Sequence, residues 1–433
     1  MKKLYLEFIR GAAALTVVTY HFLELHTLSS HSKHFYFGNW GTDAVIIFFI
    51  LSGIVINMSQ NSNPKEAKAF MGNRILRIYP QLVAGLLLGL LVLYVTNSAI
   101  PPAGVIAGNF LMLSAVKDYM INIVPSLQSN SPIWSLSYEI VFYLLFALTI
   151  GKFQKRAIGW WFILSLAIMP LYYLQTGPAV VKHFVAVISF SSIWLTGYYI
   201  YQYRSYFYAD KYTALFSVAV LPLISRMHLS TLYYDPAKYL LFAVFAVPFF
   251  SYCLQGERSG RKIRWYSLLL PYAVVEYIVF KQPYLTFTSF MAYSLLPVIL
   301  VTACFIIQKF QVQQHIRRFI FNTGKVSGKY SYSIYVIHYP VLFFCASFFH
   351  NTAITLIVSF SGVALFAYCL ENYLQPAIVN YFRKSKETYS LVTLKVAFKG
   401  LSFYDRKLGM VKKVVVPLAT AISTLFLFPF NSN

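Results

Sequence analysis

The chain has 433 residues, of which 58% are hydrophobic and only 11% are charged. A soluble protein carries about 25% charged residues, so this composition cannot cover the surfaces of several water-soluble domains. The 36 Lys and Arg outnumber the 13 Asp and Glu and give a formal net charge of +23. A basic chain can bind nucleic acid, but here the basic residues separate apolar runs of membrane-spanning length. We therefore predict an all-α, polytopic membrane protein that contacts membrane lipids and not nucleic acid.

Twelve apolar runs are candidate membrane spans. A spanning helix needs about 20 mostly apolar residues. Two runs, 214–227 and 265–281, are short enough to be half-spans, so the sequence predicts a bundle of ten to twelve spans. A further apolar segment, 105–116, is expected to be re-entrant or interfacial. The twelve runs are 4–25, 39–58, 78–97, 133–150, 158–176, 183–203, 214–227, 237–253, 265–281, 286–307, 331–349 and 352–374.

The distribution of Lys and Arg predicts the orientation of these spans. With the N-terminus in the cytoplasm, the cytoplasmic stretches hold 29 Lys and Arg, whereas the outer loops hold six. Cytoplasmic loops of membrane proteins carry such an excess. The helical body, 1–376, is followed by a basic segment, 377–433, predicted to be a cytoplasmic tail. Its stretch Leu391–Phe403 has the amphipathic character of a segment lying on anionic lipid, and its last apolar run, 414–430, either crosses the membrane or dips into it.

Two ionisable residues of the first span share one face. Arg10 and His21 are eleven residues apart, which is about 20° past three full helical turns and roughly 16 Å along the axis. Charged groups within a bilayer usually face a protein interior or a water-filled cavity. We therefore predict a functional face, with Glu7 placed to hold the guanidinium of Arg10. The alternative is an Arg and a His that anchor the two ends of the helix at the membrane interfaces.

Arg74 and Arg77 are three residues apart at the cytoplasmic entry to the third predicted span. Helical spacing puts both guanidinium groups on one side, where two bidentate donors can clamp a phosphate. Arginines at this place are also ordinary topology anchors. The spacing alone leaves both interpretations open.

The stretch Trp134–Glu139 opens the fourth predicted span from the outside. An acidic residue at that depth, beside Trp134, Ser135 and Tyr138, suits the binding of a polar acceptor. Asp43, at the outer end of the second span, is a further candidate for that role. Trp and Tyr also populate membrane interfaces by default, so an interfacial role is the alternative for the aromatic residues.

Motifs for a bound metal or a serine nucleophile are weak or absent in the sequence. His26, His31 and His34 loosely match a metal-ligand spacing, but no carboxylate or cysteine completes the set, and we expect no metal. The chain contains no G-x-S-x-G elbow, so a serine-hydrolase mechanism is unsupported.

Taken in order, the motifs resemble the acyltransferase-3 family of bacterial membrane acyltransferases. Each motif is weak on its own, but the ordered set is specific and covers nearly the whole apolar body. Arg10 and His21 match the R-x10-H pattern of that family. The other matches, in chain order, are 41–53 with Asp43, Arg74-x-x-Arg77, Trp134–Glu139, 328–340 with His338, and a closing element at Glu371.

The resemblance implies transfer of an acyl group, usually acetyl, from cytoplasmic acetyl-CoA to a sugar hydroxyl of an envelope glycan, which includes lipid-linked forms such as O-antigen precursors. It also implies residence in the bacterial inner membrane and no permanently bound cofactor. Arg10 and His21 would be essential, and Arg74 and Arg77 would serve the donor.

From these observations we predict distinct roles along the site. His21 would be the general base, because an imidazole titrates near neutral pH; a His21 acyl-enzyme is the rival chemistry. Arg10 would position the donor, and Glu139 would be a further catalytic residue on the acceptor side. The predicted acceptor-binding residues are Trp134, Ser135, Tyr138 and Asp43. The alternative function is a transporter or glycan flippase, although the inverted repeat typical of transporters is not visible.

Overall fold

The described part of the chain is almost entirely helical, which confirms the all-α prediction. Two short parallel ladders interrupt it: β1 (Ser114–Ala115) with β2 (Val124–Pro125), and β3 (Phe207–Ala209) with β4 (Arg261–Ile263). A computed structural model describes residues 2–26, 40–115, 124–151, 153–174, 176–230, 234–254, 260–282, 287–309 and 313–382.

Each predicted span corresponds to a helix in the structure. The helices that correspond to the spans are α1 (Lys2–His26), α3 (Trp40–Ser62), α4 (Ala67–Val95), α6 (Trp134–Thr149), α7 (Gln154–Leu174), α8 (Ala179–Gln202), α9 (Lys211–Ser225), α10 (Pro236–Cys253), α11 (Leu269–Phe280), α12 (Phe287–Lys309), α13 (Gln313–Phe348) and α14 (Thr352–Cys369). The short segment 105–116 folds as α5 (Ala103–Phe110) followed by β1, which is too short to cross a membrane.

Two helices begin well before their apolar runs. α4 begins at Ala67 and α13 at Gln313, although the runs begin at 78 and 331. Hydropathy marks only the apolar part of a helix, whereas polar residues such as Lys, Arg and Gln also favour helix. Arg74 and Arg77 therefore lie within α4, about two to three turns after its start.

Eight helices of the described residues are long and apolar enough to cross a membrane. Three shorter apolar helices, Lys211–Ser225, Trp265–Phe280 and Tyr293–Ala303, accompany them. α1 is not among the eight, because its ionisable side chains lower its mean hydropathy. Counted together, these twelve helices agree with a multi-pass bundle of ten to twelve spans.

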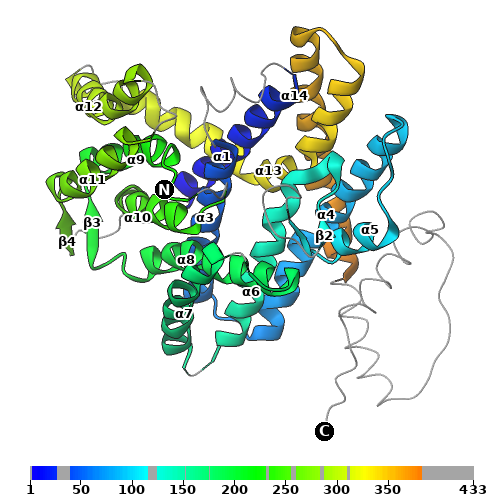
Figure 1. The fold of residues 1–433 in the computed structure, drawn as a ribbon, viewed down its shortest axis with the longest axis horizontal. Helices are drawn as coiled ribbons and strands as arrows, with labels where there is room; N and C mark the ends of the chain where they lie inside the picture. Colours follow the sequence, from blue (N-terminus) through cyan, green and yellow to red (C-terminus); the bar gives the residue numbers. More distant parts are fainter. Residues whose placement is uncertain are drawn as a thin grey trace. The chain divides into compact units, whose positions relative to one another are not determined.

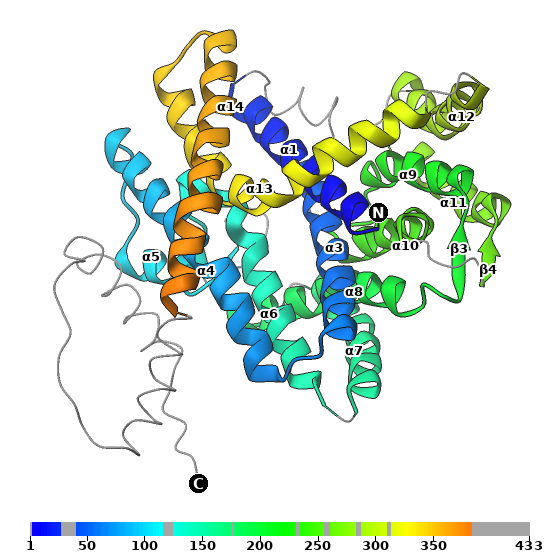
Figure 2. The same ribbon diagram turned by 180° about the vertical axis from the view of Figure 1, so that it is seen from behind.

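α1 lies directly against α13, and the two helices cross near the middle of the bundle (Figures 1 and 2). Glycines allow this close approach. A Cβ added at Gly11 would lie 2.2 Å from Ser327 Oγ, and one at Gly328 would lie 2.4 Å from the Cβ of Glu7. Small residues let helix backbones approach closely within a membrane. We call this contact the α1–α13 seam.

α3 and α8 are also in close contact. A Cβ at Gly53 would lie 2.1 Å from the Trp194 carbonyl oxygen, and one at Gly197 would lie 2.1 Å from that of Ile50. Glycine at these two positions therefore lets the backbones of α3 and α8 approach closely. The contact also fixes the position of α3 relative to α8.

Residues 1–378 form one compact unit. Of the predicted tail, 377–433, the structure describes residues up to 382, which continue helically. The amphipathic stretch 391–403 and the last apolar run, 414–430, lie outside the described residues. Their predicted association with the membrane stays a prediction.

Candidate active site

A cavity of about 180 Å³ lies between α1, α3, α4, α6 and α13. Three arginines line it, Arg10, Arg74 and Arg77, together with a single carboxylate, Glu139. The other lining residues are apolar or carry hydroxyl groups: Phe48, Phe49, Ser52, Val55, Ile56, Ile78, Ser135, Leu136, Tyr143, Ser331, Tyr332 and Tyr335. Five motifs that are far apart in the sequence thus contribute residues to one cationic cavity.

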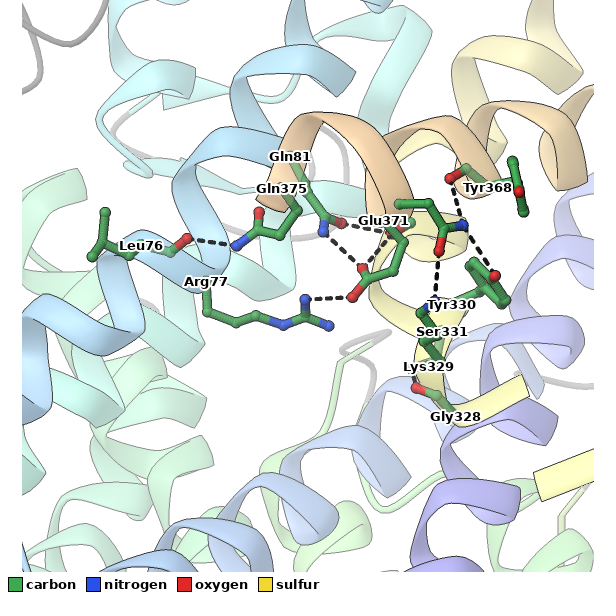
Figure 3. A network of polar contacts seen from close by, with 12 residues as sticks. Leu76, Arg77, Gln81, Gly328, Lys329, Tyr330, Ser331, Tyr368, Glu371 and Gln375 are labelled. Carbon is green, nitrogen blue, oxygen red and sulfur yellow. Dashed lines mark hydrogen bonds and ion pairs between the residues drawn. The ribbon is translucent and has the colours of Figure 1, made fainter. Parts of the chain in front are cut away.

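Arg77 is held in place by a buried carboxylate from the other end of the chain. Its Nη1 forms an ion pair with Glu371 Oε1 at 2.8 Å, and the Glu371 side chain is only 9% exposed. Gln81 Nε2 donates to Glu371 Oε2 at 2.9 Å, and the Ser333 hydroxyl donates to the same oxygen at 3.0 Å. Figure 3 shows the contacts of Glu371, in the turn after α14, with Arg77 and Gln81 of α4.

The backbone around Glu371 is unusual. Glu371 lies in η3 (Leu370–Leu374), a π-helical turn that continues α14. Such turns occur frequently at functional sites. Gln375 Nε2 donates to the Leu76 carbonyl at 2.7 Å, which fastens this turn to α4 (Figure 3). The sequence places Glu371 only in the closing element of the motif set and assigns it no role. A carboxylate in an apolar span is energetically unfavourable without a partner, and this was the signal that Glu371 pairs with another residue.

Among the described residues, neither Arg74 nor Arg10 forms an ion pair with a carboxylate. The guanidinium of Arg74 lies over the rings of Phe70 and Tyr143, at 5.3 and 5.5 Å, and its Nε is buried with no hydrogen-bond partner among the described residues. Glu7 forms an ion pair with Lys3 at 3.8 Å and, among the described residues, none with Arg10, on which it acts only through a longer-range electrostatic interaction. Arg10 is turned into the cavity instead.

Residues 134–139, which the sequence analysis treated as one group, lie on two different faces of α6. Ser135, Glu139 and Tyr143 recur every four residues and face the cavity. The Tyr143 hydroxyl donates to Glu139 Oε1 and lies 3.0 Å from Ser52 Oγ. Trp134 is five residues from Glu139, roughly 140° away around the helix. Glu139 therefore lines the cavity together with the arginines, whereas Trp134 does not, and the acceptor-side role of Glu139 stays a prediction.

Trp134 and Tyr138 lie in the aromatic core of the bundle. Their rings are 5.3 Å apart, and Trp134 also packs on Tyr234 at 5.0 Å. Both side chains are buried and neither lines the cavity. Ser135 does line it, and its Oγ is 2.7 Å from the Tyr335 hydroxyl. The four predicted acceptor residues thus do not form one site.

Asp43 lies in a different place from the other three. It lines a second, mainly apolar cavity of about 340 Å³ formed by residues of α1, α3, α9 and α10. Its Oδ1 is buried with no hydrogen-bond partner among the described residues. The structure therefore separates Asp43 from the arginine-lined cavity.

His21 is part of a small imidazole cluster at the other end of the α1–α13 seam. Its Nδ1 lies 2.6 Å from Glu24 Oε2, and its side chain is 16% exposed. Its ring centroid is 5.4 Å from that of His338 and 5.1 Å from that of Tyr339. Arg10 and His21 both face α13, which confirms that they share one face of α1. Sequence reasoning missed Glu24, although its spacing of three residues from His21 was visible.

The described residues contain no group of three His, Cys, Asp or Glu side chains that could hold a metal ion. His31 and His34 lie outside those residues. The expected absence of a metal is therefore not tested.

The bundle of apolar helices, with ionisable side chains enclosed among them, defines a multi-pass membrane protein with a buried polar site. The sequence profile of the acyltransferase-3 family, described as an acyltransferase domain, matches residues 3–371. The chain belongs to this family.

Among characterised proteins, the acyltransferase MdmB from Streptomyces mycarofaciens is 31% identical over 130 residues. That match covers 29% of this chain and 33% of the relative, so the chain spans about a third of the relative's length. No solved structure matches the chain.

Proposed function

We propose that this protein is an O-acetyltransferase that moves an acetyl group from cytoplasmic acetyl-CoA to a hydroxyl of a cell-surface polysaccharide or lipopolysaccharide sugar. It would act in the bacterial inner membrane. The observation that carries the proposal is the cavity lined by Arg10, Arg74 and Arg77, joined along the α1–α13 seam to His21.

The arginine-lined cavity suits the donor. Acetyl-CoA carries several phosphate groups, and guanidinium groups bind phosphate oxygens with paired hydrogen bonds. The Nε–H of Arg74 has no hydrogen-bond acceptor among the described residues, and a bound ligand would supply one. A volume of about 180 Å³ holds one part of the donor and not the whole molecule. We assign it to the phosphates and the start of the pantetheine arm.

His21 suits proton transfer. A carboxylate accepts and cannot donate, so the contact with Glu24 places a proton on Nδ1 and leaves the Nε2 lone pair free to take a proton from the acceptor hydroxyl. Arg10 and His21 are separated by roughly 16 Å of helix, a gap that the extended pantetheine arm would bridge. Direct transfer and an acyl-His21 intermediate both fit this arrangement.

The function can be tested with membranes that contain the protein, radiolabelled acetyl-CoA and the envelope glycan of the host. We expect label in the glycan that alkali releases, as for an ester, and no label with His21→Ala. Glycan that crosses the membrane without gaining label would contradict the proposal and favour a flippase. Label from butyryl-CoA but not acetyl-CoA would retain acyl transfer and change the donor.

A further inference from the structure

His338 is a second imidazole beside His21. It lies on α13, and its side chain is fully buried. Its Nδ1 is 2.7 Å from the Tyr335 carbonyl oxygen. A carbonyl oxygen only accepts, so Nδ1 carries the proton and Nε2 has a lone pair. That Nε2 is buried and has no hydrogen-bond partner among the described residues.

Packing alone does not account for this residue. A buried polar atom without a partner is unfavourable, and an apolar side chain of similar size would fill the place without one. His21 Nδ1–H likewise donates a hydrogen bond to Glu24 Oε2. In its neutral form His21 therefore also carries the lone pair on Nε2. The ring centroids are 5.4 Å apart, which allows a nitrogen of one ring to approach a nitrogen of the other to a hydrogen-bonding distance of about 3 Å.

We propose that His338 is a positioning residue that accepts a hydrogen bond from the Nε2–H of His21 once His21 has taken a proton. The inference rests on the proposed function. In the reaction, the acceptor hydroxyl oxygen attacks the thioester carbonyl carbon while its proton passes to His21 Nε2. The carbon–sulfur bond then breaks, and the proton held between the two histidines passes to the departing thiolate. An ester and a free thiol result, and both imidazoles are neutral again.

The groups around the pair are consistent with this role. From α1, Tyr20 packs on the His21 ring at 5.3 Å and Glu24 supplies a negative charge. From α13, Tyr335 and Tyr339 lie 5.8 and 6.2 Å from the ring of His338. Glu24 would balance the charge of an imidazolium, and the aromatic rings would keep water from competing for the shared proton.

Two substitutions separate this role from simple packing. His338→Leu fills the space but accepts no hydrogen bond, whereas His338→Gln offers an amide oxygen that accepts one. The matched control is His183→Leu, because His183 on α8 is also buried and also has an unpartnered ring nitrogen. Each variant is reconstituted in lipid nanodiscs, and acetyl transfer to glycan is measured from pH 5 to pH 9.

We expect His338→Leu to lower the rate roughly 100-fold. The acid limb of its pH–rate profile should move to lower pH. The His21 imidazolium has then lost its hydrogen-bond acceptor and gives up its proton more readily. His338→Gln should recover most of the rate, and His183→Leu should leave the acid limb in place. If the Leu variant does not fold, His338→Met provides the same comparison.

Equal losses in the Leu and Gln variants with an unmoved acid limb would overturn the inference, as would a wild-type rate in the Leu variant. Either result would leave the proposed function standing, since the wild type would still transfer acetyl. A wild type that transfers no acyl group would overturn both.

Discussion

The two ends of the α1–α13 seam differ in the kind of charge they present. At the Arg10 end, three guanidinium groups and one carboxylate line a cavity, and one of those guanidinium groups is neutralised by Glu371. At the His21 end, two imidazoles lie among aromatic rings beside Glu24. The same pair of helices supplies both ends.

This difference separates binding from proton transfer. Arginine stays protonated at all physiological pH values, so it holds an anion but does not exchange a proton. Imidazole titrates near neutral pH and does both. Glycine contacts at Gly11 and Gly328 fix the helices that carry the two ends. A long, flexible donor bound at one end could therefore deliver its reactive group to the other.

The largest expected effect comes from removing the proton acceptor at the His21 end. His21→Ala should lower acetyl transfer roughly 1,000-fold, within the range for loss of a general base. The protein should still fold, insert and bind acetyl-CoA, because the arginines are untouched. Rate measurements with radiolabelled donor, together with a donor-binding titration, check both statements. Retained acylation in a folded variant would contradict the assignment of His21 as the general base.

The Arg10 end of the seam is tested by removing two of its three guanidinium groups. Arg74→Ala combined with Arg77→Ala should raise the KM for acetyl-CoA roughly 100-fold, since hydrogen bonds to charged groups contribute about 1.5–3 kcal/mol each. The acid limb of the pH profile should stay in place, because His21 is unchanged. Steady-state kinetics over a range of acetyl-CoA concentrations check this.

The matched control for the arginine pair is Lys65→Ala with Lys68→Ala. It removes two positive charges from the same predicted cytoplasmic stretch but none from the cavity lining. We expect it to leave the KM within about twofold. Topology of both variants can be mapped by labelling introduced cysteines from each side. An inverted topology with the arginine pair removed would favour the membrane-anchor interpretation.

Glu371→Gln tests how much the partly buried ion pair orients Arg77. Gln can still meet Gln81 and Ser333 but cannot balance the guanidinium charge, so the KM for acetyl-CoA should rise about tenfold. In a background that already carries Arg77→Ala, the same substitution should add little, because coupled residues are not additive. Equal effects in both backgrounds would show that Glu371 acts independently of Arg77.

Local patterns in the sequence were enough to predict the helical body. Apolar runs located the spans, but they did not locate the polar first turns of α4 and α13, since hydropathy does not report helix propensity. The shared face of Arg10 and His21 followed from helical periodicity alone. These features depend on residues within one helix.

The contacts between side chains of different helices could not be predicted from the sequence. Arg77 and Glu371 are separated by 294 positions, and no periodicity connects them. The face of α6 that carries Glu139 could not be oriented without knowing which helices surround it. Proximity in the sequence grouped Glu139 with Trp134, whereas the helical twist separates them. Glu24 is the exception, because its place one turn after His21 is a local feature.

The smallest effect is expected for Glu24→Gln, and it bears most directly on the difference between the two ends. Gln can still accept the hydrogen bond from His21 Nδ1–H, so the ring keeps its orientation, but the negative charge that favours the imidazolium is lost. The Glu24 side chain is 34% exposed, and solvent screens such pairs, so we expect a roughly fivefold lower kcat. The acid limb should move slightly to lower pH, while the KM for acetyl-CoA stays unchanged. A change in KM without a change in kcat would mean that Glu24 serves donor binding, and the division between an anion-binding end and a proton-transfer end would not hold.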